Sequence, residues 1–169
     1  MKKVLYIWNR LYYGIYCYHS WSQILLYKIL VRIPISILCQ LGLLNQKHKN
    51  ENKEVRRSLT DEKLSTVILI SDATILAFTV LIVCTIANFS SLLIPRLSLV
   101  FLNRSSFILI ISILVMPINY FILWRKDKYL EYFKKFHSST PLKNCIWSIV
   151  SIVALIIALL MFILSMHLM

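Results

Sequence analysis

The sequence predicts an all-α integral membrane protein with three transmembrane helices and an N-terminal amphipathic, interfacial helical region. Of its 169 residues, 59% are hydrophobic and 15% are charged, whereas a soluble domain has about 45–50% apolar and about 25% charged residues. The apolar residues gather in blocks long enough to cross a bilayer. The net charge is +12, and basic residues flank these blocks, which favours a membrane setting over nucleic-acid binding.

Large aromatic side chains crowd the first forty residues, and residues 1–44 are predicted to form the interfacial region. Tyr and Trp favour the headgroup level of a bilayer, where the ring is buried and its polar end stays wet. We therefore expect an interfacial anchor, with a platform that binds a partner or ligand as the alternative. The side chains are Tyr6, Trp8, Tyr12, Tyr13, Tyr16, Tyr18, Trp21 and Tyr27.

The stretch from Ile24 to Leu44 is a candidate fourth span, but Pro34 and two basic residues interrupt it. Polar residues recur in it every four positions, which places them along one side of a helix. A narrow polar stripe of this kind favours a helix that lies in the plane of the membrane surface over a fourth span. The stripe consists of Lys28, Arg32, Ser36 and Gln40.

Residues 45–65 form a polar stretch rich in Lys, Arg, Asn and Glu. We expect it to be a cytoplasmic linker, because such a composition cannot bury enough apolar surface to fold. No nucleic-acid role is expected, since no aromatic interleaving accompanies its basic residues.

Residues 66–169 are predicted to hold the three spans, at about 73–94, 107–124 and 146–168. A span needs about 20 mostly apolar residues to cross a hydrocarbon core about 30 Å thick. Pro95 closes the first span, the pair Arg125–Lys126 ends the second, and the third contains no charged residue.

The distribution of basic residues predicts the orientation. With three spans, 17 Lys and Arg residues lie on one side of the membrane, and only Arg96 and Arg104 lie on the other. Because cytoplasmic flanks favour Lys and Arg, we expect a cytoplasmic N-terminus and an external Met169, in a cell inner membrane.

Residues 125–137 are predicted to continue the second helix into the cytoplasm as a basic helix, which ends at Ser138 to Pro141. Its aromatic residues fall on one face, with lysines available to the others. Such a helix attracts anionic lipid headgroups, at roughly 1 kcal/mol per basic residue near the surface. The aromatic face consists of Tyr129, Tyr132, Phe133 and Phe136.

Small and polar residues form a seam along each span, which predicts where helices pack within the chain, in a homo-oligomer or against another membrane protein. In the third span the seam is Ser151, Ala154 and Ala158, and in the second it includes Ser112 and Asn119. In the first span it consists of Ala73, Ala77, Val80, Cys84, Ala87 and Ser91.

Four residues are candidates for helix packing or for a polar path: Asp72, Ser112, Asn119 and Ser151. Asp72 adjoins a span, where a carboxylate serves as an ion or proton site, or lies at the interface or near a helix N-terminus. Asn119 follows Pro117, which tends to kink a helix. It either lines a small polar cavity with Ser151 or links helices by hydrogen bonding.

No pattern in the chain indicates a catalytic, cofactor or metal site. The four cysteines are widely separated, the four histidines are isolated, and the two glycines form no phosphate-binding loop. No Ser, His and Asp set gathers at one depth, and no repeated halves indicate a transporter.

The run Asn119–Tyr120–Phe121, followed by Arg125 to Tyr129 and then Phe136, resembles a motif of uncharacterised small bacterial multi-pass membrane proteins. In that group, an N-Y-aromatic helix end precedes a basic K-x-K-Y…F helix and a last apolar span. The resemblance covers about residues 73 to 168. It implies this topology and a bacterial membrane, and it assigns no functional residue.

Together these features predict a non-enzymatic membrane protein that acts through helix packing and through contacts with lipid or a partner, in an accessory or immunity-type role. The alternative is a small oligomeric channel or transporter, with Asp72, Ser112 and Asn119 along its path.

Overall fold

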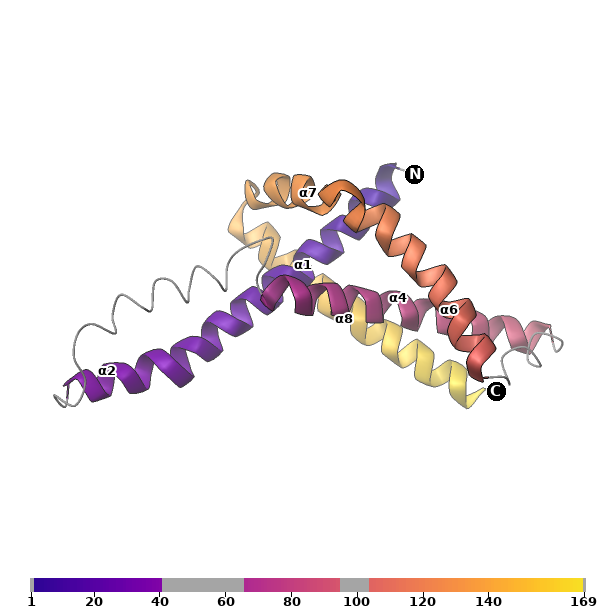
Figure 1. Cartoon of the computed structure of the whole chain (residues 1–169), viewed down its shortest axis with the longest axis horizontal. Coiled ribbons are helices and arrows are strands. Elements are labelled where there is room, and N and C mark those ends of the chain that lie inside the picture. Colours follow the sequence, from indigo (N-terminus) through magenta and orange to yellow (C-terminus); the bar gives the residue numbers. More distant parts are fainter. Residues whose placement is uncertain (1, 41–65, 95–103, 169) are drawn as a thin grey trace.

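The computed structural model describes residues 2–40, 66–94 and 104–168, and this part of the chain contains helices and no strand (Figure 1). The predicted all-α class is confirmed. The elements are α1 (Lys2–Tyr27), the π-helix η1 (Lys28–Arg32), α2 (Ile33–Gln40), α4 (Thr66–Leu93), α6 (Arg104–Asn119), the π-helix η2 (Tyr120–Trp124), the 3-10 helix η3 (Arg125–Asp127), α7 (Lys128–His137) and α8 (Pro141–His167).

Three helical stretches of the described chain are long and apolar enough to cross a membrane: Thr66–Leu93, Phe107–His137 and Pro141–His167. They correspond to the three predicted spans, which are thereby confirmed as transmembrane helices. Helices α4 and α8 begin at Thr66 and Pro141, ahead of the predicted residues 73 and 146. The residues at positions 67–70 are themselves apolar and extend the first span, and Pro141 stands in the first turn of α8, where proline is favoured.

The second span changes its helical pattern near its end. Pro117 lies inside α6, and the π-helix η2 follows directly after Asn119. Proline leaves a backbone carbonyl one turn earlier without its usual donor, and π-helical turns commonly occur where the regular hydrogen-bond ladder is interrupted.

The basic helix does not continue the second span, so that part of the prediction is wrong. Lys126 and Asp127 adopt left-handed backbone conformations, with φ of 58° and 51°, and α7 therefore sets off in a new direction (Figure 1). A left-handed residue costs about 1–2 kcal/mol. Burial of one large apolar side chain contributes about 1.5–3 kcal/mol, and α7 buries three rings, those of Tyr129, Phe133 and Phe136.

These rings pack against α1 in an aromatic core that consists of Tyr12, Tyr13, Tyr16, Tyr129, Phe133 and Phe136. Phe133 is fully buried at its centre, and the ring centroids of Tyr12, Tyr13 and Tyr16 lie 5.3, 4.9 and 5.0 Å from its own. From the sequence, these tyrosines of α1 are expected to anchor the chain at the headgroup level of the bilayer. Instead they are buried inside the protein, because α7 folds back to cover them.

Gly14 lies where α1 crosses α8. A methyl group added there would lie 2.2 Å from Ser151 Oγ and 2.6 Å from the carbonyl oxygen of Trp147, so no larger residue fits at this separation of the helices. Ser151 Oγ lies within hydrogen-bond distance of the carbonyl oxygens of Leu11 (3.0 Å) and Trp147 (2.7 Å). Close approach and a polar link therefore fix the crossing of α1 on α8.

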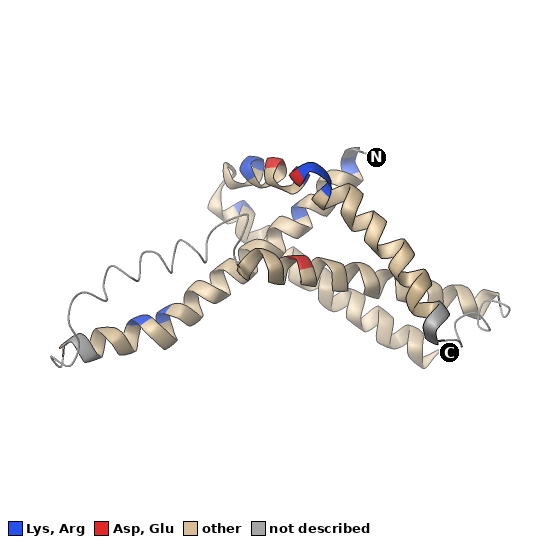
Figure 2. Ribbon diagram, in the orientation of Figure 1, with Lys and Arg blue, Asp and Glu red and all other residues tan. Residues whose placement is uncertain are grey.

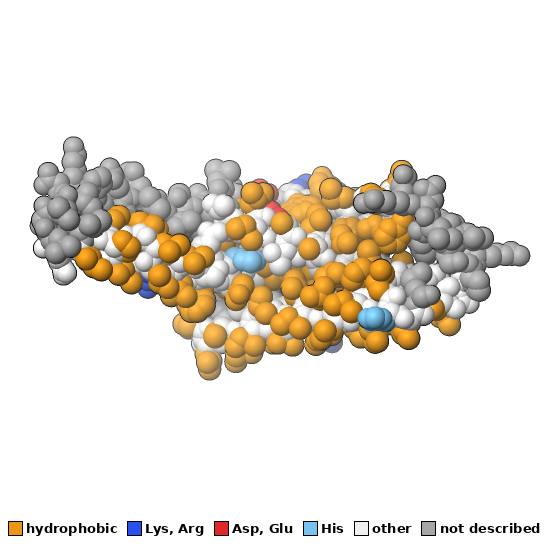
Figure 3. All heavy atoms as spheres, turned by 90° about the horizontal axis from the view of Figure 1, so that it is seen from below, with side chains coloured by type: hydrophobic (Ala, Val, Ile, Leu, Met, Phe, Trp, Pro, Cys, Tyr) orange, Lys and Arg blue, Asp and Glu red, His pale blue; other side chains and the backbone are white. Residues whose placement is uncertain are grey.

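Beyond this crossing the N-terminal helical run leaves the three spans (Figure 1). Its distal part, residues 25–37, exposes apolar side chains such as Leu26, Ile29 and Leu30, which contribute to the broad apolar surface in Figure 3. This run is not among the stretches that qualify as spans. Its placement in the membrane plane stays a prediction. Residues 41–44, the predicted linker 45–65 and the turn with Arg96 lie outside the described residues.

Candidate functional site

Polar side chains at three levels of α4 link this helix to its neighbours, and the first is Asp72. Its Oδ1 atom accepts hydrogen bonds from the hydroxyl of Tyr12 and from Nε1 of Trp124, the latter at 2.9 Å. Asp72 thus joins α4 to both α1 and η2. Asp72 lies beyond the first turn of α4, which begins at Thr66. The predicted alternative that Asp72 lies near a helix N-terminus is therefore wrong.

Tyr12 is the buried donor in this junction. Burial, followed by the hydrogen bond and the negative charge of Asp72, raises the pKa of Tyr12 above its ordinary value. The phenol therefore stays protonated and donates to the carboxylate at any physiological pH. A neutral donor held against a carboxylate stabilises the junction, but it is no proton carrier near neutral pH.

The second polar link joins α4 to α6 through Thr79 and Asn119, both of which are buried. The hydroxyl of Thr79 donates to the carbonyl oxygen of Ile75 at 2.8 Å and accepts from Asn119 Nδ2 at 3.1 Å. Asn119 Nδ2 also donates to the carbonyl oxygen of Val115 at 3.1 Å. Asn119 thus serves as an interhelical link, and its amide is occupied.

The third polar link joins α4 to α8. Asn88 Nδ2 donates to Ser165 Oγ at 3.0 Å, and the hydroxyl of Ser165 donates in turn to the carbonyl oxygen of Phe162 at 2.7 Å. At about 1.5 Å per helical residue, Asp72, Thr79 and Asn88 divide α4 into steps of roughly 10 and 14 Å. The links therefore hold the bundle at three separate depths.

Arg10 of α1 is buried among α7 and α8, with 1% of its surface exposed. Its Nη2 atom donates to Asn144 Oδ1 at 2.9 Å, and its guanidinium lies over the rings of Phe136 and Trp147, at 4.5 and 5.7 Å from their centroids. Nε and Nη1 have no hydrogen-bond partner, and no carboxylate in the described chain pairs with it. Cation–π contacts, worth about 2 kcal/mol or more when desolvated, replace a counter-ion.

The four predicted site residues do not meet at one place. Asp72 binds α1 and η2, Asn119 binds α4, and Ser151 lies at the crossing of α1 on α8. Ser112 is exposed on α6. The cavity that would have joined Asn119 to Ser151 is not formed, because each has a partner on a different helix.

The packing seam predicted for the first span is correct only in its second half. Cys84 and Ser91 are buried, whereas Ala73 and Ala77 are exposed. Larger side chains, among them Ile75 and Phe78, fill the contact at the start of α4. The predicted seam is wrong there because α1 packs on this part of α4, a contact that no local pattern in the sequence indicates.

The basic side chains of residues 125–137 lie mostly on the outer side of the aromatic core, where they are exposed. Residues 125–137 contain five basic and two acidic side chains, and Arg125, Lys126, Lys134 and Lys135 are all exposed. Figure 2 marks in blue the positions of basic residues along the ribbon, and several of them lie on η3 and α7 and at the N-terminal part of α1. The rings of α7 thus face the protein, and its charges face outward.

Two features of the described residues bear on chemistry, namely metal-ligating clusters and unpartnered polar atoms. No group of three or more His, Cys, Asp and Glu side chains gathers there to hold a metal ion. Within the three spans, no buried side-chain nitrogen or oxygen of a described residue lacks a hydrogen-bond partner; the unpartnered ones, including those of Arg10, belong to α1. The spans therefore use their polar groups to hold one another.

Sequence reasoning counted Arg10 only as one more basic residue. A signal was present, because Tyr6, Arg10 and Tyr13 follow the spacing of one helix face, and a cation among aromatic residues on one face is a candidate for cation–π packing. What the sequence lacked was the position of α7 and α8.

Comparison of the chain with known protein families, with curated proteins and with solved structures finds no match. The resemblance to small bacterial multi-pass membrane proteins stays a prediction.

Proposed function

We propose that this chain is a non-enzymatic integral membrane protein that acts by presenting a rigid basic surface, formed by residues 125–137, to anionic lipid headgroups or to a partner protein. An accessory or immunity-type role fits this description. The observation that carries the proposal is the mutual pairing of the polar side chains in the spans, at Asp72, at Asn119 and at Asn88. Side chains that serve as links between helices are engaged within the chain, which supports a role other than transport.

The proposed setting is a bacterial inner membrane, with the N-terminus and residues 125–137 in the cytoplasm and Met169 outside. The 17-to-2 distribution of basic residues supports this orientation. Reporter fusions at Met169 and within residues 45–65 test it. An external reporter at Met169 and a cytoplasmic one in residues 45–65 are expected, and a cytoplasmic Met169 would overturn the three-span orientation.

An ion-flux assay separates this proposal from its alternative, a small oligomeric channel or transporter. Purified protein in vesicles of phosphatidylethanolamine and phosphatidylglycerol should give no more flux than protein-free vesicles, because the polar groups of the spans are occupied. Flux above that background, lost in Asp72→Ala or Asn119→Ala, would establish the alternative.

The basic surface is tested by the lipid preference of the full chain. Spin-labelled phosphatidylglycerol should be immobilised at the protein more than spin-labelled phosphatidylcholine, and Lys134→Gln with Lys135→Gln should reduce the difference, at roughly 1 kcal/mol per charge near the surface. The pair Asp127→Asn and Glu131→Gln provides a control of opposite sign and should increase it. Equal immobilisation of the two lipids by the unaltered chain would refute the lipid part of the proposal.

A further inference from the structure

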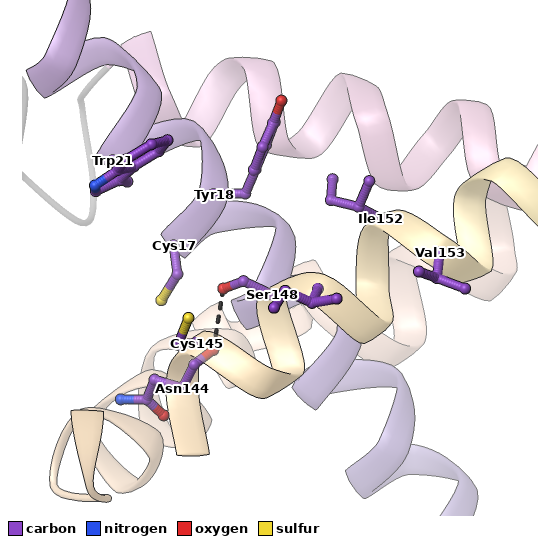
Figure 4. Close-up of a pocket in the computed structure, with 9 residues that line it drawn as sticks. Cys17, Tyr18, Trp21, Asn144, Cys145, Ser148, Ile152 and Val153 are labelled. Carbon is purple, nitrogen blue, oxygen red and sulfur yellow. Dashed lines mark hydrogen bonds between the residues drawn. The ribbon is translucent and has the colours of Figure 1, made fainter. Parts of the chain in front are cut away.

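A groove opens beside the crossing of α1 on α8, with a volume of about 510 Å³. It arises because the two helices are held together at Gly14 and Ser151 and diverge beyond that point. The volume lies within the roughly 300–1,000 Å³ of small-molecule sites. Figure 4 shows residues of α1 and α8 that line it, with Cys17 and Cys145 pointing toward each other. The lining also includes Tyr18, Trp21, Ile149 and Val153.

The chemistry of the lining favours a hydrocarbon chain. No charged side chain lines the groove, and its polar residues Asn144 and Ser148 lie close together on α8. Ser148 Oγ donates to the carbonyl oxygen of Asn144 at 3.0 Å, and Asn144 Oδ1 accepts from Arg10 and from Ser139 Oγ. A polar ligand would lose its hydration and find few partners, which is unfavourable.

The lipid bilayer around the helices would supply the hydrocarbon chain. Helix α8 is a transmembrane span, and the groove lies on its first half, between residues 144 and 153. Trp21, Ile149 and Val153 are exposed at 63, 59 and 47%, so the groove is open at the surface that a bilayer covers. Trp21 is also of the residue type that favours the boundary between headgroups and acyl chains.

We infer that this groove binds one acyl chain of a membrane phospholipid. The inference goes beyond the basic surface proposed above, and it requires only that the chain is embedded in a membrane. Transfer of an acyl chain from the bilayer to the groove gains little from the hydrophobic effect, because both surroundings are apolar. Retention must come from van der Waals contact with walls that the Gly14 crossing keeps in place.

Native mass spectrometry tests the site. Protein extracted into detergent from vesicles of phosphatidylethanolamine and phosphatidylglycerol should retain one phospholipid per chain. Ile149→Trp fills the groove and should lower the retained fraction about tenfold, or about 1.4 kcal/mol. Ile156→Trp places the same change two turns along the same exposed face of α8 and should leave retention as it is. A lipid-free unaltered chain, or equal retention in the two variants, would overturn the inference.

A second measurement needs no change in the groove and covers the case in which Ile149→Trp fails to fold. Cys145 is exposed and lines the groove, whereas Cys84 is buried. In a Cys39→Ser background, adding phosphatidylglycerol to delipidated protein should slow the alkylation of Cys145 by N-ethylmaleimide. An unchanged rate would refute the site, and so would protection that depends on dimerisation and persists without lipid.

Discussion

The two halves of the N-terminal helical run are both apolar with basic residues, but only the first half packs into the protein. Residues 2–20 pack into the protein, where Tyr12 and Ile15 are 0 and 2% exposed. Residues 25–37 leave the bundle, and Ile29 and Leu30 are 50 and 67% exposed. Both halves are apolar and both carry basic residues.

The difference lies in the residues that have partners elsewhere in the chain. The first half has a glycine at the helix crossing, a tyrosine hydrogen-bonded to Asp72 and an arginine held by Asn144 and aromatic rings. In the second half the apolar side chains of Leu26, Ile29 and Leu30 are exposed instead. Apolar composition favours the removal of a helix from water. Whether the helix then packs against protein or against lipid depends on complementary partners elsewhere in the chain.

The aromatic core accounts for the largest part of this difference. Phe133→Ala removes the fully buried ring that contacts Tyr12, Tyr13 and Tyr16, and such a change costs about 3–5 kcal/mol. We expect a large fall in the thermal stability of the purified protein and faster alkylation of the half-buried Cys17. Phe121→Ala is the matched control, because Phe121 is 52% exposed, and a similar loss in both variants would contradict the core.

The helix crossing is expected to contribute next. Gly14→Ala places a methyl group 2.6 Å from the carbonyl oxygen of Trp147, a backbone atom that cannot turn away, and overpacking of this kind costs about 1–3 kcal/mol. Thermal unfolding in detergent measures the loss. The double variant Gly14→Ala with Ser151→Ala removes the hydroxyl but not the backbone contact, so it should recover only part of the stability. Full recovery would show that Ser151 alone sets the crossing.

Much of this molecule could be predicted from its sequence, and the failures share one cause. The three spans and the aromatic face of α7 follow from apolar length and helical spacing, which are local properties of the chain. The failures are contacts between helices distant in the sequence: the surroundings of Tyr12 and Arg10 depend on α7 folding back onto α1 after Lys126 and Asp127, and the partners of Asp72 depend on α1 and η2 packing against α4. Left-handed conformations at lysine and aspartate carry no clear sequence signal, because glycine is the residue usually found there.

The Asp72 junction ties the packed half of the run to α4, and its two hydrogen bonds should each contribute about 0.6 to 1.7 kcal/mol. Asp72→Ala should therefore lower stability by about 1–3 kcal/mol. Asp72→Asn keeps an oxygen that accepts from Tyr12 and Trp124 and should retain much of it. Circular dichroism during heating separates the variants. If Asn is as damaging as Ala, the charge of Asp72 matters beyond these two bonds.

His19 lies near the end of the packed half and gives it a pH dependence. Its Nε2 atom lies 3.0 Å from Thr74 Oγ1, and burial lowers the pKa of His19. Because the unfolded chain has a histidine pKa of about 6.5, the folded state binds this proton less readily. Stability should be full above that value and should fall as the pH drops toward the lower folded pKa. His19→Gln should reduce this decline, and an unchanged profile would exclude His19 as its source.

The smallest effect is expected at Ile29 in the distal half, and Ile15 in the packed half of the same helical run is its direct comparison. Ile15 is 2% exposed and Ile29 is 50% exposed. Ile15→Ala leaves a cavity and should cost about 2–5 kcal/mol, whereas Ile29→Ala changes a surface position and should stay within about 0.5 kcal/mol. Thermal unfolding of both variants in detergent tests this. A large loss at Ile29 would mean that the distal half has a protein partner, such as a second copy of the chain, because lipid and detergent accept alanine at little cost.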